Sequence, residues 1–280
     1  MRNPLVTTSW LQDHLSDCKL VLLDASMNKV VGKKAVEYDK LILIPETKKL
    51  DLENTLCDMN SSQIHAFPTA KQFSLEAQRL GIKSDSTVVI YDNQGIYSAP
   101  RAWWIFQAMG FTNVLVLDGG LPKWISENRE TVSEYSLGIT EQGDVKGSFK
   151  SNLVCDSKYI MEHLYNDLFT VVDARSNERF LGMMPEPRSG VRSGHIPESI
   201  NLPFAEVLDG DSFKTQEQIT AIFETIVKDD CQLIFSCGSG ITACIILLAS
   251  RIAGYQSVTL YDGSWADWGG NELFPIVEPS

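Results

Sequence analysis

Short runs of four or five apolar residues alternate along this chain with longer segments rich in helix-forming residues. A run this short, bounded by polar residues or glycine, is typical of a buried strand. Strands are predicted within 20–26, 87–92, 114–120, 169–175, 199–202, 233–235 and 258–264. Helices are predicted at 9–16, 99–109, 157–165 and 241–253. Strands that alternate with helices favour a parallel sheet covered by helices on both faces.

The pattern occurs twice along the chain. Leu20–Ser26 matches Phe169–Arg175, and Trp124 matches Trp268, so the offset is 144 to 149 residues. An offset this constant indicates a tandem duplication. We therefore predict an α/β fold with two domains, 1–128 and 153–280. The polar, glycine-containing segment between them, 129–152, is predicted to be a linker.

The stretch Cys237-Gly-Ser-Gly-Ile-Thr242 joins a predicted strand to a predicted helix. Such a loop surrounds its first side chain with backbone N–H groups and the positive end of a helix dipole. Both favour a thiolate over a neutral thiol, so Cys237 is a candidate nucleophile. The alternative is a buried structural cysteine. Cys244, inside the apolar helix, fits that alternative better than Cys237 does.

The two halves carry chemically different residues at the position of Cys237. Asp92 occupies the position of Cys237 in the first half. A carboxylate there cannot carry sulfur, so any chemistry of the cysteine is predicted to belong to the second half. In open parallel sheets, ligands bind outside the carboxyl ends of the strands. Cys237 is expected at that edge.

Three arginines lie on the segment 179–195, which contains two prolines and three glycines and is predicted to be a long loop. Loops of this kind often carry function. Arginine is suited to two-pronged recognition of a carboxylate, so Arg179 and Arg188 are candidate binding residues. For Arg192, a solvated surface role and a site role remain equally open. His195 is expected to be structural and to hydrogen-bond the backbone.

The composition limits which partners, cofactors and cellular compartment are expected for this chain. The chain of 280 residues has a formal net charge of −12, which argues against nucleic acid or an anionic membrane as a partner. The N-terminus has no apolar signal segment, and the longest apolar run is too short to span a bilayer. The six cysteines and four histidines show no metal-ligand spacing, so no metal or other cofactor is expected. Free thiols suggest the cytoplasm.

These motifs together resemble the rhodanese superfamily, and within it the tandem-domain 3-mercaptopyruvate sulfurtransferases. The likeness rests on Cys237–Ala243, Asp262-Gly-Ser-Trp265, Glu186-Pro-Arg188, Gly194-His-Ile-Pro197 and Tyr97–Trp104. It runs nearly end to end and is weakest over 27–60 and the linker.

The resemblance implies a sulfurtransferase in which Cys237 receives sulfur as a persulfide and passes it to cyanide or a thiol, such as a thioredoxin-like protein or a small dithiol. It also implies that Arg179 and Arg188 hold the donor. The remaining loop residues are expected to line the substrate site: Gly238, Ser239, Gly240, Ile241 and Thr242. Ser239 is expected to take part in catalysis. Neutral Gly238 and Ser239 predict a rim without cations and favour the monoanion 3-mercaptopyruvate over thiosulfate.

One departure from the family pattern concerns a histidine. In these enzymes the first domain usually carries a His-Ile-Pro-Gly segment, whose histidine is proposed in some members to form a relay with the loop serine. The corresponding stretch here is Leu43-Ile-Pro-Glu46. A relay from a first-domain histidine to Ser239 is therefore not expected. Proton transfer to the leaving enolate would then fall to Ser239 with water, or to the substrate itself.

Three other functions compete with this interpretation. A thiosulfate:cyanide sulfurtransferase would use the same cysteine with another donor. A non-catalytic rhodanese-like module would bind or carry persulfide only, and the retained Cys237 and arginines argue against it. A dual-specificity phosphatase needs arginine at the sixth position after its cysteine, to clamp phosphate. Ala243 stands there and nearly excludes that class.

Overall fold

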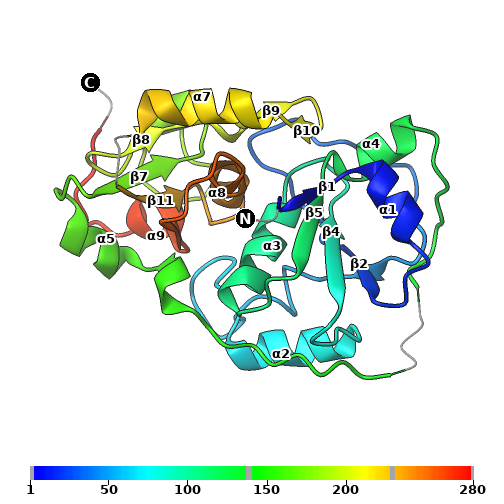
Figure 1. Cartoon of the computed structure of the whole chain (residues 1–280). Coiled ribbons are helices and arrows are strands. Elements are labelled where there is room, and N and C mark those ends of the chain that lie inside the picture. The colour runs from blue at the N-terminus through cyan, green and yellow to red at the C-terminus, as the bar shows by residue number, and fades with distance from the viewer. Residues whose placement is uncertain (1–2, 137–140, 228–230, 279–280) are drawn as a thin grey trace. The chain divides into compact units, whose positions relative to one another are not determined.

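The computed structural model describes residues 3–136, 141–227 and 231–278 (Figure 1). The chain forms two compact units, and each takes a short segment from the other's stretch of sequence. Unit 1 consists of 1–60, 67–150 and 209–213, and unit 2 of 61–66, 151–208 and 214–280. Residues 61–66 therefore pack with the second half of the chain. The domain bounds 1–128, 129–152 and 153–280 stay a prediction, and the described part of 129–150 groups with unit 1.

Unit 1 contains a five-stranded parallel sheet in the order β1-β5-β4-β2-β3. Its strands are β1 Leu5–Val6, β2 Leu20–Asp24, β3 Lys48–Lys49, β4 Thr87–Tyr91 and β5 Val114–Leu117. The central strands are almost entirely buried, which is the pattern of a sheet covered on both faces.

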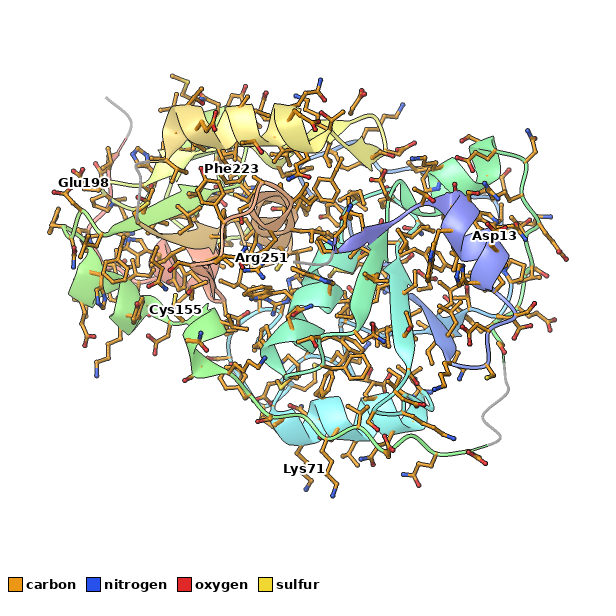
Figure 2. The ribbon with its side chains drawn as sticks, viewed as in Figure 1. Asp13, Lys71, Cys155, Glu198, Phe223 and Arg251 are labelled. Carbon is orange, nitrogen blue, oxygen red and sulfur yellow. The ribbon has the colours of Figure 1, made fainter. Side chains whose placement is uncertain are left out.

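Helices cover both faces of this sheet, as predicted. They are α1 Thr8–His14, α2 Ala70–Arg79, α3 Ala99–Ala108 and α4 Gly120–Ser126. Leu11 of α1 and Trp124 of α4 share one core cluster with Val89 and Tyr91 of β4. Phe73 of α2 contacts Phe106 of α3 edge to face, at a centroid distance of 5.0 Å. In Figure 2 the side chains of Asp13 and Lys71 point away from this unit.

Unit 2 repeats the architecture with the sheet order β6-β12-β11-β7-β8. Its strands are β6 Val154–Cys155, β7 Phe169–Asp173, β8 Ile200–Asn201, β11 Gln232–Ser236 and β12 Val258–Tyr261. The equal strand order of the two sheets confirms the duplication. A short strand pair, β9 Leu208–Asp209 with β10 Ser212–Phe213, lies outside both sheets.

The helices of unit 2 also lie on both faces of its sheet. They are α5 Ser157–His163, α6 Asn177–Phe180, α7 Gln216–Ile226, α8 Ala243–Ile252 and α9 Ser264–Trp268, with 3-10 turns η1 Ser151–Leu153 and η2 Phe204–Val207. Ile160 of α5 and Trp268 of α9 pack on Ile234. Phe223 of α7 contacts Phe235 on the opposite face of the same strand. Among the helices of the described residues, none is long and apolar enough to cross a membrane.

The predicted strands and helices are confirmed, with ends that move by one to three residues. The helix predicted at 241–253 begins later, at Ala243, because the glycine loop takes up its first two positions. The sequence did not indicate α2 or α7, although each begins with a capping box, at Thr69 and Thr215.

Candidate active site

Cys237 follows the central strand of the second sheet. β11 lies between β7 and β12, and all three run parallel, so the loop leaves the carboxyl edge in the middle of the sheet. This is the predicted place for a ligand. The side chain of Cys237 is 2% exposed. The site is therefore sheltered from water, which strengthens any charge interaction made inside it.

The loop after Cys237 is fixed by the turn that follows β12. Ser264 Oγ accepts a hydrogen bond from the Cys237 amide at 3.1 Å, and the Trp265 amide donates to the Cys237 carbonyl at 2.9 Å. Gly240 has φ +79°, a left-handed conformation that favours glycine. Ile241 is buried, and Thr242 is half-buried at the start of α8. The loop thus curls around its cysteine in a single defined conformation.

The prediction that Arg179 lies on an irregular loop is wrong. Arg179 lies on the short helix α6. Its Nε donates to Glu186 Oε1 at 3.1 Å, and its Nη2 donates to Glu186 Oε2. The Glu186 side chain is only 2% exposed, so this ion pair holds the guanidinium in a fixed direction. That direction is toward Gly238, where a Cβ would meet Arg179 Nη2 at 3.1 Å and Arg188 Nη1 at 3.8 Å.

Arg188 lies beside the same loop and donates from Nη2 to Ser239 Oγ at 3.2 Å. The structure therefore brings Arg179, Arg188, Gly238 and Ser239 together. It also corrects the expectation of a rim without cations. Neutral side chains at 238 and 239 leave room for two guanidinium groups from a distant segment of sequence, and these supply the charge instead.

Ser239 also has a histidine partner, contrary to the prediction. His65 Nδ1 lies 3.1 Å from Ser239 Oγ. Because a guanidinium can only donate, Ser239 accepts from Arg188. Its hydroxyl keeps a second lone pair and its own proton, so it can accept from or donate to His65 Nδ1, according to the tautomer of the imidazole. The prediction compared only the Leu43–Glu46 stretch. The histidine comes from 61–66, the segment that packs with unit 2, and no motif in the sequence marked it.

A buried arginine that the sequence reading missed supports this arrangement. Arg175 is 2% exposed and makes a forked ion pair with Asp173, with Nη2 2.6 Å from Oδ2. Its Nη1 donates to Glu186 at 2.9 Å, and its guanidinium lies 4.4 Å from the Trp265 ring centroid. Ion pairs thus connect Asp173 to Arg175, Arg175 to Glu186, and Glu186 to Arg179. Burial opposes the charge of Arg175, but the two carboxylates outweigh it and raise the pKa of the guanidinium.

Arg192 has neither of the two roles left open for it. Its guanidinium donates to four backbone carbonyls, those of Trp268, Gly269, Asn271 and Phe274. It therefore holds the C-terminal segment in place. His195 is structural, as predicted: its Nδ1 lies 2.8 Å from the Phe180 carbonyl, and its ring stacks on the Phe180 ring.

The other cysteines of unit 2 lack the setting of Cys237. Cys244 is fully buried in α8, and its Sγ lies 3.4 Å from the Gly240 carbonyl, which confirms its structural character. Burial, aided by the Asp156 and Asp262 carboxylates, raises the pKa of Cys155 far above its usual range. Within the described residues, no group of three His, Cys, Asp or Glu side chains is placed to hold a metal ion.

The equivalent loop of unit 1 shows what such a loop binds. Asp92 is fully buried after β4. Its Oδ2 accepts from the amides of Tyr97, Ser98 and Ala99 at 2.8–2.9 Å, and its Oδ1 accepts from Gln94. Four backbone N–H groups thus converge on the side chain at the first loop position. A loop of this design holds an anion.

The comparisons with known proteins agree with the duplicated fold. A rhodanese-like domain matches twice, at residues 7–127 and 157–271. The 3-mercaptopyruvate sulfurtransferase of Mus musculus is 37% identical over 273 residues, covering 94% of this chain and 91% of the relative. The thiosulfate sulfurtransferase of Rattus norvegicus is 36% identical over 273 residues, and this match also covers 94% of this chain and 91% of the relative.

A solved structure extends the similarity to three dimensions. The crystal structure of SseA from Escherichia coli, described as a 3-mercaptopyruvate sulfotransferase with the rhodanese fold, superposes with a TM-score of 0.81 at 30% identity. The match covers 94% of this chain and 99% of that chain. The second segment that the rhodanese-like domain matches, 157–271, contains β11, the Cys237 loop, Arg179 and Arg188.

Proposed function

Because this chain belongs to the rhodanese-like domain family and is a sulfurtransferase, we propose that it takes sulfur from 3-mercaptopyruvate onto Cys237. The observation that carries the proposal is the placement of Arg179 and Arg188 beside Gly238, directly after the buried Cys237. A nucleophile and two cations that can bind a carboxylate therefore meet at one loop.

In the first half-reaction, the Cys237 thiolate attacks the sulfur of the donor. A sulfur–sulfur bond forms, and the bond between sulfur and the donor's methylene carbon breaks. The electron pair of that bond passes to the enolate of pyruvate, which takes one proton to become pyruvate. Cys237 is left as a persulfide, on a loop that is equivalent to the one whose backbone N–H groups hold Asp92 in unit 1.

The two arginines orient the donor for this attack. The carboxylate and keto oxygens of 3-mercaptopyruvate carry the charge that builds up as the enolate forms. Arg179 and Arg188 provide fixed positive charge on the side of the loop where that charge appears. Since the Glu186 ion pair holds Arg179 before the donor binds, little reorganisation is needed during the reaction.

Ser239 is the proposed proton donor to the leaving enolate. Its hydroxyl lies between Arg188 and His65, at 3.2 and 3.1 Å. Arg188 favours the alkoxide that forms when Ser239 releases its proton, and His65 can return a proton through Nδ1. Gly238, Gly240, Ile241 and Thr242 shape the loop around the donor.

In the second half-reaction, a nucleophilic acceptor, either a thiolate or the carbon of cyanide, attacks the outer sulfur of the persulfide. The sulfur–sulfur bond breaks, the outer sulfur leaves on the acceptor, and the Cys237 thiolate is regenerated. Cyanide, a small dithiol or a thioredoxin-like protein can supply such a nucleophile. A thiol acceptor must be reduced, so we propose that the protein works in a reducing compartment such as the cytoplasm.

Thiosulfate is the second candidate donor, and one observation favours it. Two guanidinium groups beside Gly238 would suit a compact dianion. Against it, Glu186 places a carboxylate on one of these cations, which lowers the net positive charge available.

Steady-state kinetics with the two donors side by side test the choice. We expect a higher kcat/KM for 3-mercaptopyruvate, and mass spectrometry should find one added sulfur, about 32 Da, on Cys237. A kcat/KM for thiosulfate equal to or above that for 3-mercaptopyruvate would make the protein a thiosulfate sulfurtransferase.

A further inference from the structure

His65 reaches Ser239 from a segment with little packing of its own. Segment 61–66 belongs to unit 2, yet Ser61, Ser62 and Ile64 are exposed. His65 itself has φ +55°, a left-handed conformation that costs a residue with a side chain about 1–2 kcal/mol. Such a conformation persists only where contacts nearby impose it. Something other than apolar burial must therefore fix the direction of the imidazole.

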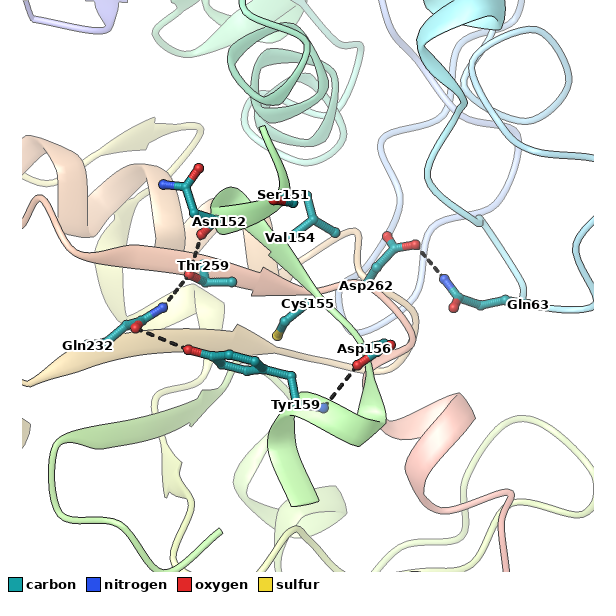
Figure 3. A pocket seen from close by; sticks show the side chains of 10 residues that line it. All are labelled: Gln63, Ser151, Asn152, Val154, Cys155, Asp156, Tyr159, Gln232, Thr259 and Asp262. Carbon is teal, nitrogen blue, oxygen red and sulfur yellow. Dashed lines mark hydrogen bonds between the residues drawn. The ribbon is translucent and has the colours of Figure 1, made fainter. Parts of the chain in front are cut away.

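One contact that holds this segment to the body of unit 2 is a hydrogen bond from Gln63. Its Nε2 donates to Asp262 Oδ2 at 2.5 Å, and Figure 3 shows the two side chains pointing at each other. Asp262 is 7% exposed, so the bond joins an amide to a buried carboxylate. Bonds of this charge-assisted kind are stronger than neutral ones.

Gln63 lines two hollows, so its side chain is only partly packed and the bond to Asp262 matters the more. One cavity of about 510 Å³ extends from Gln63 along β6 and is also lined by Cys155 and Tyr159 (Figure 3). A second, of about 310 Å³, lies between Ser62–Ile64 and residues of α9. Gln63 lines both hollows and links its segment to the body of unit 2 through Asp262.

Asp262 belongs to the same turn that fixes the nucleophile loop. Two residues further on, Ser264 Oγ accepts from the Cys237 amide. The turn after β12 therefore holds the cysteine loop with one residue and the histidine segment with another. The spacing between Cys237, Ser239 and His65 depends on both contacts.

We propose that Gln63 is a positioning residue, which acts through the Asp262 carboxylate to aim His65 at Ser239. The inference rests on the proposed proton transfer through Ser239 and His65. Gln63 touches neither donor nor sulfur in this role. Its loss should slow the protonation of the leaving enolate and leave donor binding by Arg179 and Arg188 unchanged.

A double-mutant cycle tests the proposal with 3-mercaptopyruvate as donor. Gln63→Ala should lower kcat about fivefold to tenfold, with KM unchanged, because one charge-assisted bond is lost. In a His65→Ala background, Gln63→Ala should have almost no further effect on kcat. Ser62→Ala, on the same segment and exposed, is the matched control and should behave as wild type.

Exchanging the hydrogen-bond donor and acceptor between positions 63 and 262 should restore kcat, a result that a purely structural role of Gln63 would not predict. Gln63→Glu sets a carboxylate against Asp262 and should lower kcat at least as much as Gln63→Ala does. Adding Asp262→Asn places an amide opposite that carboxylate and restores a hydrogen bond with donor and acceptor exchanged. We expect kcat to recover to within about twofold of wild type.

Two results would overturn the proposal. One is an equal loss of kcat from Gln63→Ala with and without His65, and the other is a wild-type kcat for His65→Ala. Failure of the proposed function gives a different result: wild-type protein would acquire no sulfur on Cys237 from 3-mercaptopyruvate. Thermal unfolding of each variant checks that unit 2 remains folded.

Discussion

The loops that begin at Asp92 and at Cys237 share two backbone features and have opposite uses. Gly95 and Gly240 both have positive φ, +94° and +79°. The carbonyl of Asp92 accepts from the Leu121 amide at 3.0 Å, and that of Cys237 accepts from the Trp265 amide at 2.9 Å. In unit 1 the chain's own carboxylate fills the ring of N–H groups. In unit 2 the first residue of the loop carries a sulfur that can leave.

The comparison teaches that the loop is a general anion holder, and that chemistry depends on what stands at its first position and beside it. The halves differ again after the equivalent strands β2 and β7. Asp24 accepts from Ser26 and Tyr135, whereas Asp173 pairs with Arg175, which leads through Glu186 to Arg179. In the second half, an arginine–carboxylate network thus extends from Asp173 to the Cys237 loop.

The largest expected effect comes from giving Cys237 the residue of the first half. Cys237→Asp should abolish sulfur transfer, by at least about a thousandfold in kcat/KM, because a carboxylate cannot accept sulfur. It should keep the fold, since loop N–H groups hold a carboxylate in unit 1. Cys237→Ser should be equally inactive.

Mass spectrometry after incubation with donor checks the assignment of the nucleophile. Wild type should carry the added sulfur on Cys237, and both variants should carry none. Sulfur found mainly on Cys231 or Cys244 in the wild type would refute it.

The second effect concerns the stability of the first half. Asp92→Ala leaves four buried N–H groups without their acceptor and should lower the free energy of unfolding of unit 1 by about 3 kcal/mol. Asp92→Asn keeps one acceptor oxygen and should cost less. Urea unfolding followed by circular dichroism measures both. Equal stability of wild type and Asp92→Ala would show that the carboxylate is dispensable.

The third effect concerns the two arginines beside the Cys237 loop. Arg179→Ala and Arg188→Ala should each lower kcat/KM for 3-mercaptopyruvate by roughly 10- to 100-fold, the value of a charge-assisted hydrogen bond of about 1.5–3 kcal/mol. Arg192→Ala is the control. Its guanidinium holds backbone carbonyls, so stability should fall while KM stays near wild type. If both arginine variants kept wild-type kinetics, the donor would bind elsewhere.

The fold could be predicted from the sequence because the duplicated strands are short, apolar and regularly spaced. Their repetition at one offset identified both sheets, and Cys237 followed from the glycine loop. Contacts between distant segments could not be predicted. Arg175, His65 and the Gln63–Asp262 bond depend on which segment packs where, and no local pattern encodes that. Arg192 shows the same limit, since its four carbonyl partners all lie near the C-terminus.

The smallest expected effect concerns Cys155, a cysteine of the second half whose replacement should not change sulfur transfer. The sheet registers pair Val6 with Leu117 and Cys155 with Tyr261, so Val6 and Cys155 occupy equivalent edge positions. Burial and the neighbouring Asp156 and Asp262 carboxylates raise the pKa of Cys155, so at neutral pH it is a thiol and a poor nucleophile.

Cys155→Val installs the residue of the first half and should leave kcat and KM within about twofold of wild type, because the position contributes packing alone. In wild type, iodoacetamide at pH 7.5 should modify Cys237 and the exposed Cys18 well before Cys155. Since a raised pKa keeps the thiol protonated until the pH exceeds it, labelling of Cys155 should stay slow as the pH rises to 9. Rapid labelling of Cys155, or loss of activity in Cys155→Val, would mean that the second half uses two cysteines. The contrast between the two halves would then extend beyond the Cys237 loop.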